Sequence, residues 1–299
     1  MKVVVGGASG LIGQALVGAL GREGHEVLRL VRREARSKDE VRWDPGQPLD
    51  PAALAGVDAA VNLVGAGVGD RRWTPAYKKV LLDSRVGSTH TLAAALAALE
   101  PRPRVFVAGS AVGYYGADHG AEELDEKSAA GEDFLARLCV QWEAAAAPAA
   151  NAGIRVAHAR TGLVIDSSGG AAKRMFPLFK LGLGGRLGSG RQYWPCISLE
   201  DEVRALLFLL TADGVSGPVN LAAPEPTTNA KLTQALGRTL HRPTLAPAPG
   251  FALKLVLGEF AGAVLGSQRV VPKALLAAGF TFRHPDVDTI VGAALGRPA

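Results

Sequence analysis

The chain has few cysteines, and its histidines stand alone. Only Cys139 and Cys196 occur among 299 residues, which is too few for a disulfide framework, and their spacing does not match a metal site. The six histidines are scattered singly rather than grouped as metal ligands would be. We therefore expect reduced thiols and no bound metal.

Long apolar runs and a strong charge of either sign are also missing. No stretch reaches the roughly eighteen uncharged apolar residues of a membrane span, and the chain enters an apolar strand without a signal-peptide layout. With 33 basic against 28 acidic residues the formal charge is +5, and the basic clusters lack interleaved aromatic residues. These features predict a cytoplasmic protein that binds neither membranes nor nucleic acid.

The sequence contains enough hydrophobic residues to form a full core. Its length allows one large domain or two closely joined domains. Hydrophobic residues make up 48% of the chain, and apolar strand-like runs alternate with helical patterns. This alternation predicts a parallel sheet with helices on both faces. The expected strands are Lys2–Val5, Glu26–Val31, Ala59–Leu63, Arg104–Ala108 and Arg155–Arg160, and the expected helices are Leu11–Arg22, Tyr77–Leu99 and Glu132–Ala147.

A glycine-rich loop follows the first expected strand. Gly7, Gly10 and Gly13 lie between the apolar run 3–5 and the helical pattern that begins at Leu11. In dinucleotide sites, such glycines allow a tight turn, a close approach of the pyrophosphate to the backbone, and close packing of helix on strand. Free N–H groups and the positive end of the helix dipole then favour an anion. Strand, turn and helix occur in the required order, so we predict a dinucleotide site.

In the second half of the chain the regular alternation of expected strands and helices ends. A glycine-rich stretch over 182–190 lacks the Lys-Ser/Thr pair of a P-loop and is expected to be a loop near a substrate cleft. Pro148 and Gly153 predict that the alanine-rich segment 144–152 is a helix end and a turn. The remaining expected elements are the helices Glu200–Leu210, Asn229–Leu240, Phe251–Leu257 and Pro272–Ala278 and the strand Pro218–Leu221.

These patterns predict an α/β protein built on a Rossmann-type doubly wound parallel sheet. We expect the dinucleotide-binding domain to cover residues 1–165, with segments of about 197–222 returning to it. A smaller, mainly helical C-terminal cap over 166–299 would hold the substrate.

NAD-binding versions of this fold usually have an Asp or Glu at the end of the second strand, which accepts hydrogen bonds from the ribose hydroxyls. Here the second expected strand ends in Leu30-Val31-Arg32-Arg33, and no acidic residue stands at its end. A guanidinium suits a 2′-phosphate through charge-assisted hydrogen bonds. We therefore predict NADP(H) in preference to NAD(H). Two solvated arginines remain the alternative interpretation.

Several motifs together resemble the extended short-chain dehydrogenases/reductases. The broad matches are the three glycines, Asn62-Leu63-Val64-Gly65 and the segment 109–116. More specific segments resemble an atypical subgroup of NAD(P)-dependent nucleotide-sugar epimerases, also labelled cell-division-inhibitor-like, with a small C-terminal domain of unknown function. They are Asp70-Arg71-Arg72-Trp73, Ser84-Arg85, Trp142-Glu143, residues 181–185 and 188–192, and Ser267-Gln268-Arg269-Val270.

The resemblance implies roles by position along the carboxyl edge of the sheet. It places one set of residues at the pyrophosphate, a second at the adenosine phosphate, a third at the adenine and its ribose, and two more facing the cofactor. In that order they are Gly7, Gly10, Leu11 and Ile12; Arg32, with Val31 and Arg33 as further expected cofactor contacts; Leu63, Val64 and Gly65; and Arg85 with Ser110. Ser110 also falls where the wider superfamily keeps its catalytic serine.

The catalytic pair of the superfamily is missing. A Tyr and a Lys four residues later normally exchange a proton with substrate, but the matching positions here are Phe134 and Leu138. The remaining candidates for polar contact with a substrate are Ser110 and Tyr114. The subgroup commonly has Trp and His where this chain has Cys196 and Ser198, and loop packing is the favoured interpretation of that segment.

Two functions remain open. One is an NADP(H)-dependent oxidoreductase or epimerase acting on a carbonyl or sugar-like small molecule, which the cofactor loop and the cap favour. The other is a non-catalytic NADP(H)-binding sensor or regulatory protein, which the missing Tyr-Lys pair favours. The sequence names neither a substrate nor an oligomeric state.

Overall fold

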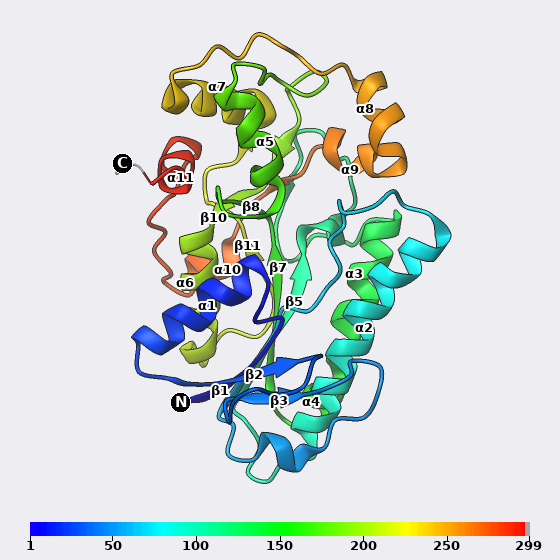
Figure 1. Ribbon diagram of the computed structural model, residues 1–299, viewed down its shortest axis with the longest axis vertical. Helices are drawn as coiled ribbons and strands as arrows, with labels where there is room; N and C mark the ends of the chain where they lie inside the picture. The colour runs from blue at the N-terminus through cyan, green and yellow to red at the C-terminus, as the bar shows by residue number, and fades with distance from the viewer. Residues whose placement is uncertain (297–299) are drawn as a thin grey trace.

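The computed structural model describes residues 1–296, apart from the side chains at positions 171 and 174. Its central feature is a seven-stranded sheet with the strand order β11-β7-β5-β4-β1-β2-β3, in which all neighbours are parallel (Figure 1). The strands are β1 Lys2–Gly6, β2 Glu26–Val31, β3 Glu40–Arg42, β4 Ala59–Asn62, β5 Val105–Ala111, β7 Arg155–Thr161 and β11 Gly217–Leu221. The strand order reverses beside β1, which places a topological switch point at the glycine loop.

Helices cover both faces of this sheet. The helices α1 (Leu11–Arg22) and α6 (Leu199–Thr211) pack on one face, and α2 (Pro75–Ala97) and α4 (Ala147–Asn151) pack on the other. Successive residues of a strand point to opposite faces, so Val3 and Val5 enter the first core and Val4 enters the second. All three valines are fully buried, as expected for a strand covered on both sides.

Further elements lie beyond the carboxyl ends of the strands and form the upper part of the molecule in Figure 1. Their helices are α5 Gly170–Lys180, α7 Asn229–Leu240, α8 Gly250–Leu257, α9 Ala261–Leu265 and α11 Val287–Ala294, with α10 Lys273–Ala277 lower down against the sheet. Short sheets pair β8 Leu163–Ile165 with β10 Cys196–Ser198, β9 Tyr193–Trp194 with β12 Thr227–Thr228, and β6 Glu123–Leu124 with β13 Arg269–Val270. Helix α3 (Phe134–Ala144) and three short 3-10 turns, Pro51–Leu54, Val112–Tyr115 and Gly258–Phe260, complete the chain.

The Rossmann-type fold is confirmed, but some expected elements were wrong in detail. The predicted helix Glu132–Ala147 is shorter, and the expected turn at 144–152 contains the separate helix α4. Pro148 lies in the first turn of α4, where a missing N–H costs no hydrogen bond. Helix α5 was not predicted, because Gly169, Gly170 and Pro177 interrupt its helical pattern.

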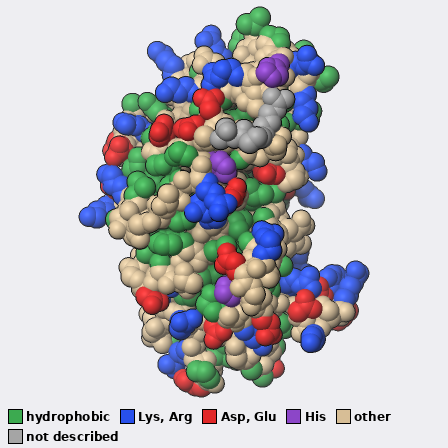
Figure 2. All heavy atoms as spheres, turned by 90° about the vertical axis from the view of Figure 1, so that its left-hand side faces the viewer, with side chains coloured by type: hydrophobic (Ala, Val, Ile, Leu, Met, Phe, Trp, Pro, Cys, Tyr) green, Lys and Arg blue, Asp and Glu red, His purple; other side chains and the backbone are tan. Residues whose placement is uncertain are grey.

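The surface has mixed charge. On the face shown in Figure 2, acidic and basic side chains are interspersed over the whole height of the molecule. Among residues 1–296, no helix combines the length and apolar character that crossing a bilayer requires.

Candidate functional site

The glycine loop has the geometry of a ligand cradle. Gly7 adopts a left-handed φ of +79°, and a methyl group on it would lie 2.7 Å from the Leu63 carbonyl carbon. A methyl group on Gly13 would lie 2.2 Å from Gly7 O, so helix α1 packs directly on the loop. The nearest atom to a methyl group on Gly10 is 3.5 Å away. Gly7 and Gly13 are therefore required by the fold, whereas a methyl group on Gly10 would make only an ordinary van der Waals contact.

The N-terminus of α1 is free to bind an anion. Gly10 occupies the N-cap position and has no side chain that could accept the first N–H groups, and the first turn contains no acidic residue. Leu11 and Ile12 begin the helix and are half-buried. Unsatisfied N–H groups and the positive end of the helix dipole meet at this point. A pyrophosphate fits this position.

The two arginines after β2 have different surroundings. The guanidinium of Arg33 donates two hydrogen bonds, of 2.7 and 2.6 Å, to the carboxylate of Glu40 on β3. These bonds, with one from the Arg36 backbone N–H, lower the pKa of Glu40 to about 2. Arg32 is exposed, and no described residue forms a hydrogen bond or ion pair with it. Of the two, Arg32 is the cation available to an external phosphate.

Sequence reasoning missed Glu40. It belongs to a strand of three residues, which is too short to produce a recognisable alternation. Val31, the last residue of β2, pairs with Arg42 of the same strand.

The end of β4 lies beside the glycine loop. Leu63 N donates to Gly6 O at 2.9 Å, which holds the segment Leu63–Gly65 next to Gly7. Asn62, just before it, is fully buried, and its amide donates to the Ser88 and Thr89 hydroxyls on α2. Arg85, also on α2, lies against Gly65.

Ser110, near the end of β5, is part of a buried polar network. Its side chain is almost fully buried, and its hydroxyl donates to Glu143 Oε1 at 2.6 Å. The same carboxylate accepts two hydrogen bonds from the Arg160 guanidinium, of 2.8 and 2.9 Å. The serine hydroxyl therefore has its proton directed to Glu143, and only its lone pairs are left for another partner.

Two tyrosines extend this network. The Arg160 guanidinium lies 3.4 Å from the centre of the Tyr114 ring and donates to the Tyr115 hydroxyl at 3.1 Å. Tyr115 is fully buried, donates to Asn220 Oδ1 at 2.7 Å, and has its pKa raised to about 12 by burial. Tyr114 is only half-buried, and its hydroxyl has no hydrogen bond to any described residue. Of the two, Tyr114 is the one that can reach a ligand.

Sequence reasoning named Ser110 and Tyr114 but assigned no role to Glu143 or Arg160. Their pairing joins α3 to β7, so no local pattern reports it. A usable signal is Arg160 itself, which stands among apolar residues near the end of a strand expected in the middle of the sheet, because a buried charge needs a partner.

The positions that replace the usual Tyr-Lys pair are apolar contacts. Phe134 begins α3 and packs edge-on against Trp73, with ring centres 5.2 Å apart. Leu138 is buried against Trp142 and its neighbours. Neither position presents a group that can exchange a proton.

The segment with Cys196 and Ser198 has a structural role. The Ser198 hydroxyl caps α6 by accepting from Asp201 N at 3.0 Å, and it also lies 2.9 Å from His284 Nδ1. Cys196 is buried, and burial raises the pKa of its thiol to about 12. Cys139, the other cysteine, is also buried and unpaired, and its thiol pKa is raised in the same way. Within the described residues, no cluster of His, Cys, Asp and Glu side chains could hold a metal ion.

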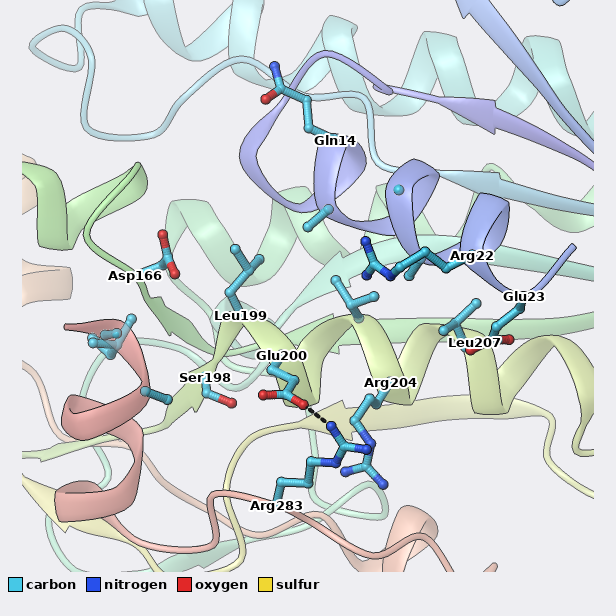
Figure 3. Close-up of a pocket in the computed structure, with 17 residues that line it drawn as sticks. Gln14, Arg22, Glu23, Asp166, Ser198, Leu199, Glu200, Arg204, Leu207 and Arg283 are labelled. Carbon is cyan, nitrogen blue, oxygen red and sulfur yellow. Dashed lines mark hydrogen bonds and ion pairs between the residues drawn. The ribbon is translucent and has the colours of Figure 1, made fainter. Parts of the chain in front are cut away.

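A groove of about 630 Å³ runs between α1 and α6, on the side of α1 that faces α6 and α11 (Figure 3). Both apolar and charged residues of α1 and α6 line it, and the ion pair Glu200–Arg283 lies among them. None of the residues predicted for the cofactor site line it. The glycine loop and the network around Ser110 are therefore separate from this groove.

Comparisons with known proteins show the family of the chain. Residues 3–222 match the NAD dependent epimerase/dehydratase family, and residues 248–294 match a domain of unknown function, DUF1731. An epimerase family protein of Mycobacterium bovis is 48% identical over 299 residues, which cover 99% of this chain and 98% of the relative.

Two solved structures are also similar along almost the whole chain. The human epimerase family protein SDR39U1 (isoform 2), crystallised with NADPH, is 34% identical, with a TM-score of 0.92 and 99% of both chains covered. A nucleoside-diphosphate sugar epimerase from Corynebacterium glutamicum is 34% identical, with a TM-score of 0.83, covering 99% of this chain and 58% of that one. The chain belongs to the NAD dependent epimerase/dehydratase family, as an SDR39U1-like member with a DUF1731 C-terminal domain.

Proposed function

We propose that the protein binds NADP(H) along the carboxyl ends of β1, β2, β4 and β5. The observation that carries this proposal is the open, uncapped N-terminus of α1 at Gly10. The exposed, unpaired Arg32 supports a 2′-phosphate on the bound nucleotide. NADPH in the crystals of the human relative is consistent with both features.

We further propose that the protein is an oxidoreductase or epimerase acting on a carbonyl or sugar-like small molecule. The bound nicotinamide supplies or accepts hydride in such reactions. Ser110, whose proton is held by Glu143, accepts a hydrogen bond from a substrate hydroxyl other than the reacting one. Tyr114, whose hydroxyl is unpaired, exchanges the proton with the substrate oxygen.

Arg160 supports this assignment of Tyr114. A cation against the face of a phenol ring stabilises negative charge that develops there during proton transfer. In the wider superfamily a lysine provides the cation, whereas here the guanidinium 3.4 Å from the Tyr114 ring centre has that position. The couple Tyr114–Arg160 therefore replaces the missing Tyr-Lys pair in this proposal.

The test is NADPH oxidation against a panel of quinones, ketones and nucleotide sugars. We expect slow turnover by the wild type, because imperfect acid-base assistance forfeits up to about 10²–10⁴ in rate. Tyr114→Phe should lower the rate further without changing NADPH affinity. The double variant Phe134→Tyr/Leu138→Lys should raise it. If the wild type is fast and both Ser110→Ala and Tyr114→Phe match it, these roles are wrong.

A non-catalytic sensor is the second candidate. The observation in its favour is that both positions of the usual pair hold apolar residues, Phe134 and Leu138, which belong to one hydrophobic cluster. A sensor would bind NADPH and gain thermal stability from it, while no compound of the panel would be turned over by the wild type or the double variant.

A further inference from the structure

Three aromatic side chains from separate parts of the chain, Trp73, Phe134 and Phe260, form what we call the aromatic wall. Trp73 lies in the loop before α2, Phe134 begins α3, and Phe260 ends the last 3-10 turn, within the DUF1731 domain. The Trp73 ring centre lies 5.2 Å from that of Phe134 and 5.3 Å from that of Phe260. All three side chains are only half-buried, so part of each stays accessible to a ligand.

The aromatic wall lies next to Tyr114, the proton donor of the proposed function. Gly131 N, three residues before Phe134, donates to Tyr114 O at 2.9 Å. Tyr114, Trp73 and Phe134 also pack against the same buried cluster, which contains Leu138. A substrate whose carbonyl oxygen meets the Tyr114 hydroxyl is therefore within reach of these rings.

Polar contacts hold the C-terminal segment at the wall. Lys78 Nζ pairs with Glu259 Oε1 at 2.6 Å, and Arg72 Nη2 donates to Leu255 O at 2.6 Å. In Figure 1 the helices α8 and α9, which flank this 3-10 turn, lie above the start of α2. The DUF1731 domain is thereby fastened to the N-terminal part of the chain, and this contact gives Phe260 its place in the wall.

The aromatic wall has no polar atom to spare for a ligand. Trp73 Nε1, its one hydrogen-bonding side-chain atom, donates to Val68 O at 2.8 Å. Lys78, whose Nζ lies 4.9 Å from the Phe134 ring centre, is paired with Glu259. A sugar ring carries hydroxyls on most of its carbons, and each hydroxyl that leaves water needs a new partner. The wall presents ring surface instead.

We propose that the substrate is a planar aromatic carbonyl compound with at most one further hydroxyl, rather than a sugar. This inference rests on the proposed function, because it takes Tyr114 as the proton donor. An aromatic substrate gains from offset or edge-on contact with the wall, whereas sugar hydroxyls would lose water and gain no partner there. Ser110 and Tyr114 still provide contacts for one hydroxyl and for the carbonyl oxygen.

The reaction of such a substrate is a balanced reduction. The carbonyl carbon receives the hydride of NADPH, and the carbonyl oxygen receives the Tyr114 proton. The products are an alcohol and NADP⁺, and the tyrosinate regains its proton from water.

The test titrates three compounds into the NADP⁺-saturated protein by calorimetry: the aryl ketone α-tetralone, its saturated analogue α-decalone, and UDP-glucose. We expect α-tetralone to bind more tightly than either of the others. Phe260→Leu keeps an apolar side chain but removes the ring, so it should weaken α-tetralone by about 2–10-fold and leave α-decalone nearly unchanged. Phe134→Leu is a second variant with the same expected result, so the test does not depend on one substitution.

Phe251→Ala is the matched control, because it removes an exposed phenyl ring from α8, outside the aromatic wall. It should leave all affinities unchanged. The inference is overturned if α-tetralone does not bind, if UDP-glucose binds more tightly than α-tetralone, or if both leucine variants bind the two ketones as the wild type does. If the wild type binds no nucleotide, the proposed function fails, and the same titrations into the free protein decide the inference by the same criteria.

Discussion

At the scale of single residues, the carboxylate of Glu143 holds the site together. It accepts hydrogen bonds from Ser110 and from Arg160, and both of those side chains are almost fully buried. Removing one partner of a buried ion pair leaves the other charge uncompensated, which typically costs about 3–5 kcal/mol.

We therefore expect Glu143→Gln to lower the free energy of unfolding by about 3–5 kcal/mol in urea titrations. Ser110→Ala removes one hydrogen bond to this carboxylate and leaves the ion pair with Arg160 in place, so it should cost less, about 1.5–3 kcal/mol. The exposed Arg137→Gln on the same helix serves as control and should change stability by less than about 0.5 kcal/mol. A loss below about 1 kcal/mol for Glu143→Gln would show that Arg160 does not depend on this carboxylate.

A second residue-scale prediction separates the two arginines after β2. Arg32→Ala should weaken NADPH more than NADH, by about 1–3 kcal/mol, because it removes a charge-assisted contact to the 2′-phosphate. Arg33→Ala should leave the ratio of the two affinities nearly unchanged, since Glu40 already occupies its guanidinium. Calorimetric titration of NADPH and NADH into both variants measures the ratio of the two affinities. An equal change of this ratio in the two variants would contradict the assignment of Arg32 to the 2′-phosphate.

At the scale of elements, the junction of β1 and α1 determines ligand binding. Gly10→Val should abolish nucleotide binding with little loss of stability, because its side chain would collide with no protein atom but would occupy the volume that a pyrophosphate needs. Gly13→Val is the contrast: its side chain would collide with Gly7 O, so the fold itself should be lost. Circular dichroism with calorimetry distinguishes these results. Retained binding by a folded Gly10→Val would exclude this loop as the phosphate site.

How well each element could be predicted depends on how local its causes are. The glycine loop and the helix Leu11–Arg22 were predicted correctly, because strand, turn and helix follow one another along the chain. The pair of Glu143 and Arg160 was missed, because only the packing of α3 on β7 brings the two side chains together. The different surroundings of Arg32 and Arg33 were missed for the same reason, since Glu40 reaches Arg33 from the neighbouring strand.

At the scale of the whole molecule, a buried acid links stability to pH. Glu202 is fully buried on α6, accepts from the Thr161 hydroxyl at 2.7 Å, and has no hydrogen-bond partner at Oε2 within the described chain. Burial raises its pKa from 4.5 to about 8, so the folded protein keeps a proton that the unfolded chain releases. Stability falls with pH wherever the unfolded state binds fewer protons.

The free energy of unfolding should therefore decrease as pH rises from about 4.5 to about 8, and the wild type should show a steeper decrease than Glu202→Gln. Glu200→Gln on the same helix is the control, because that carboxylate is exposed at the surface, where it pairs with Arg283. Urea titrations at several pH values measure the difference. Parallel pH profiles for the wild type and Glu202→Gln would show that Glu202 is ionised in the folded protein.

The account as a whole depends on one claim, that this member of the epimerase/dehydratase family is built for NADP(H). Calorimetric titration of the wild-type protein with NADPH and NADH tests that claim most directly. The account predicts that NADPH binds more tightly, because Arg32 is exposed and unpaired beside the end of β2. Equal affinities, a preference for NADH, or no binding of either nucleotide would contradict it.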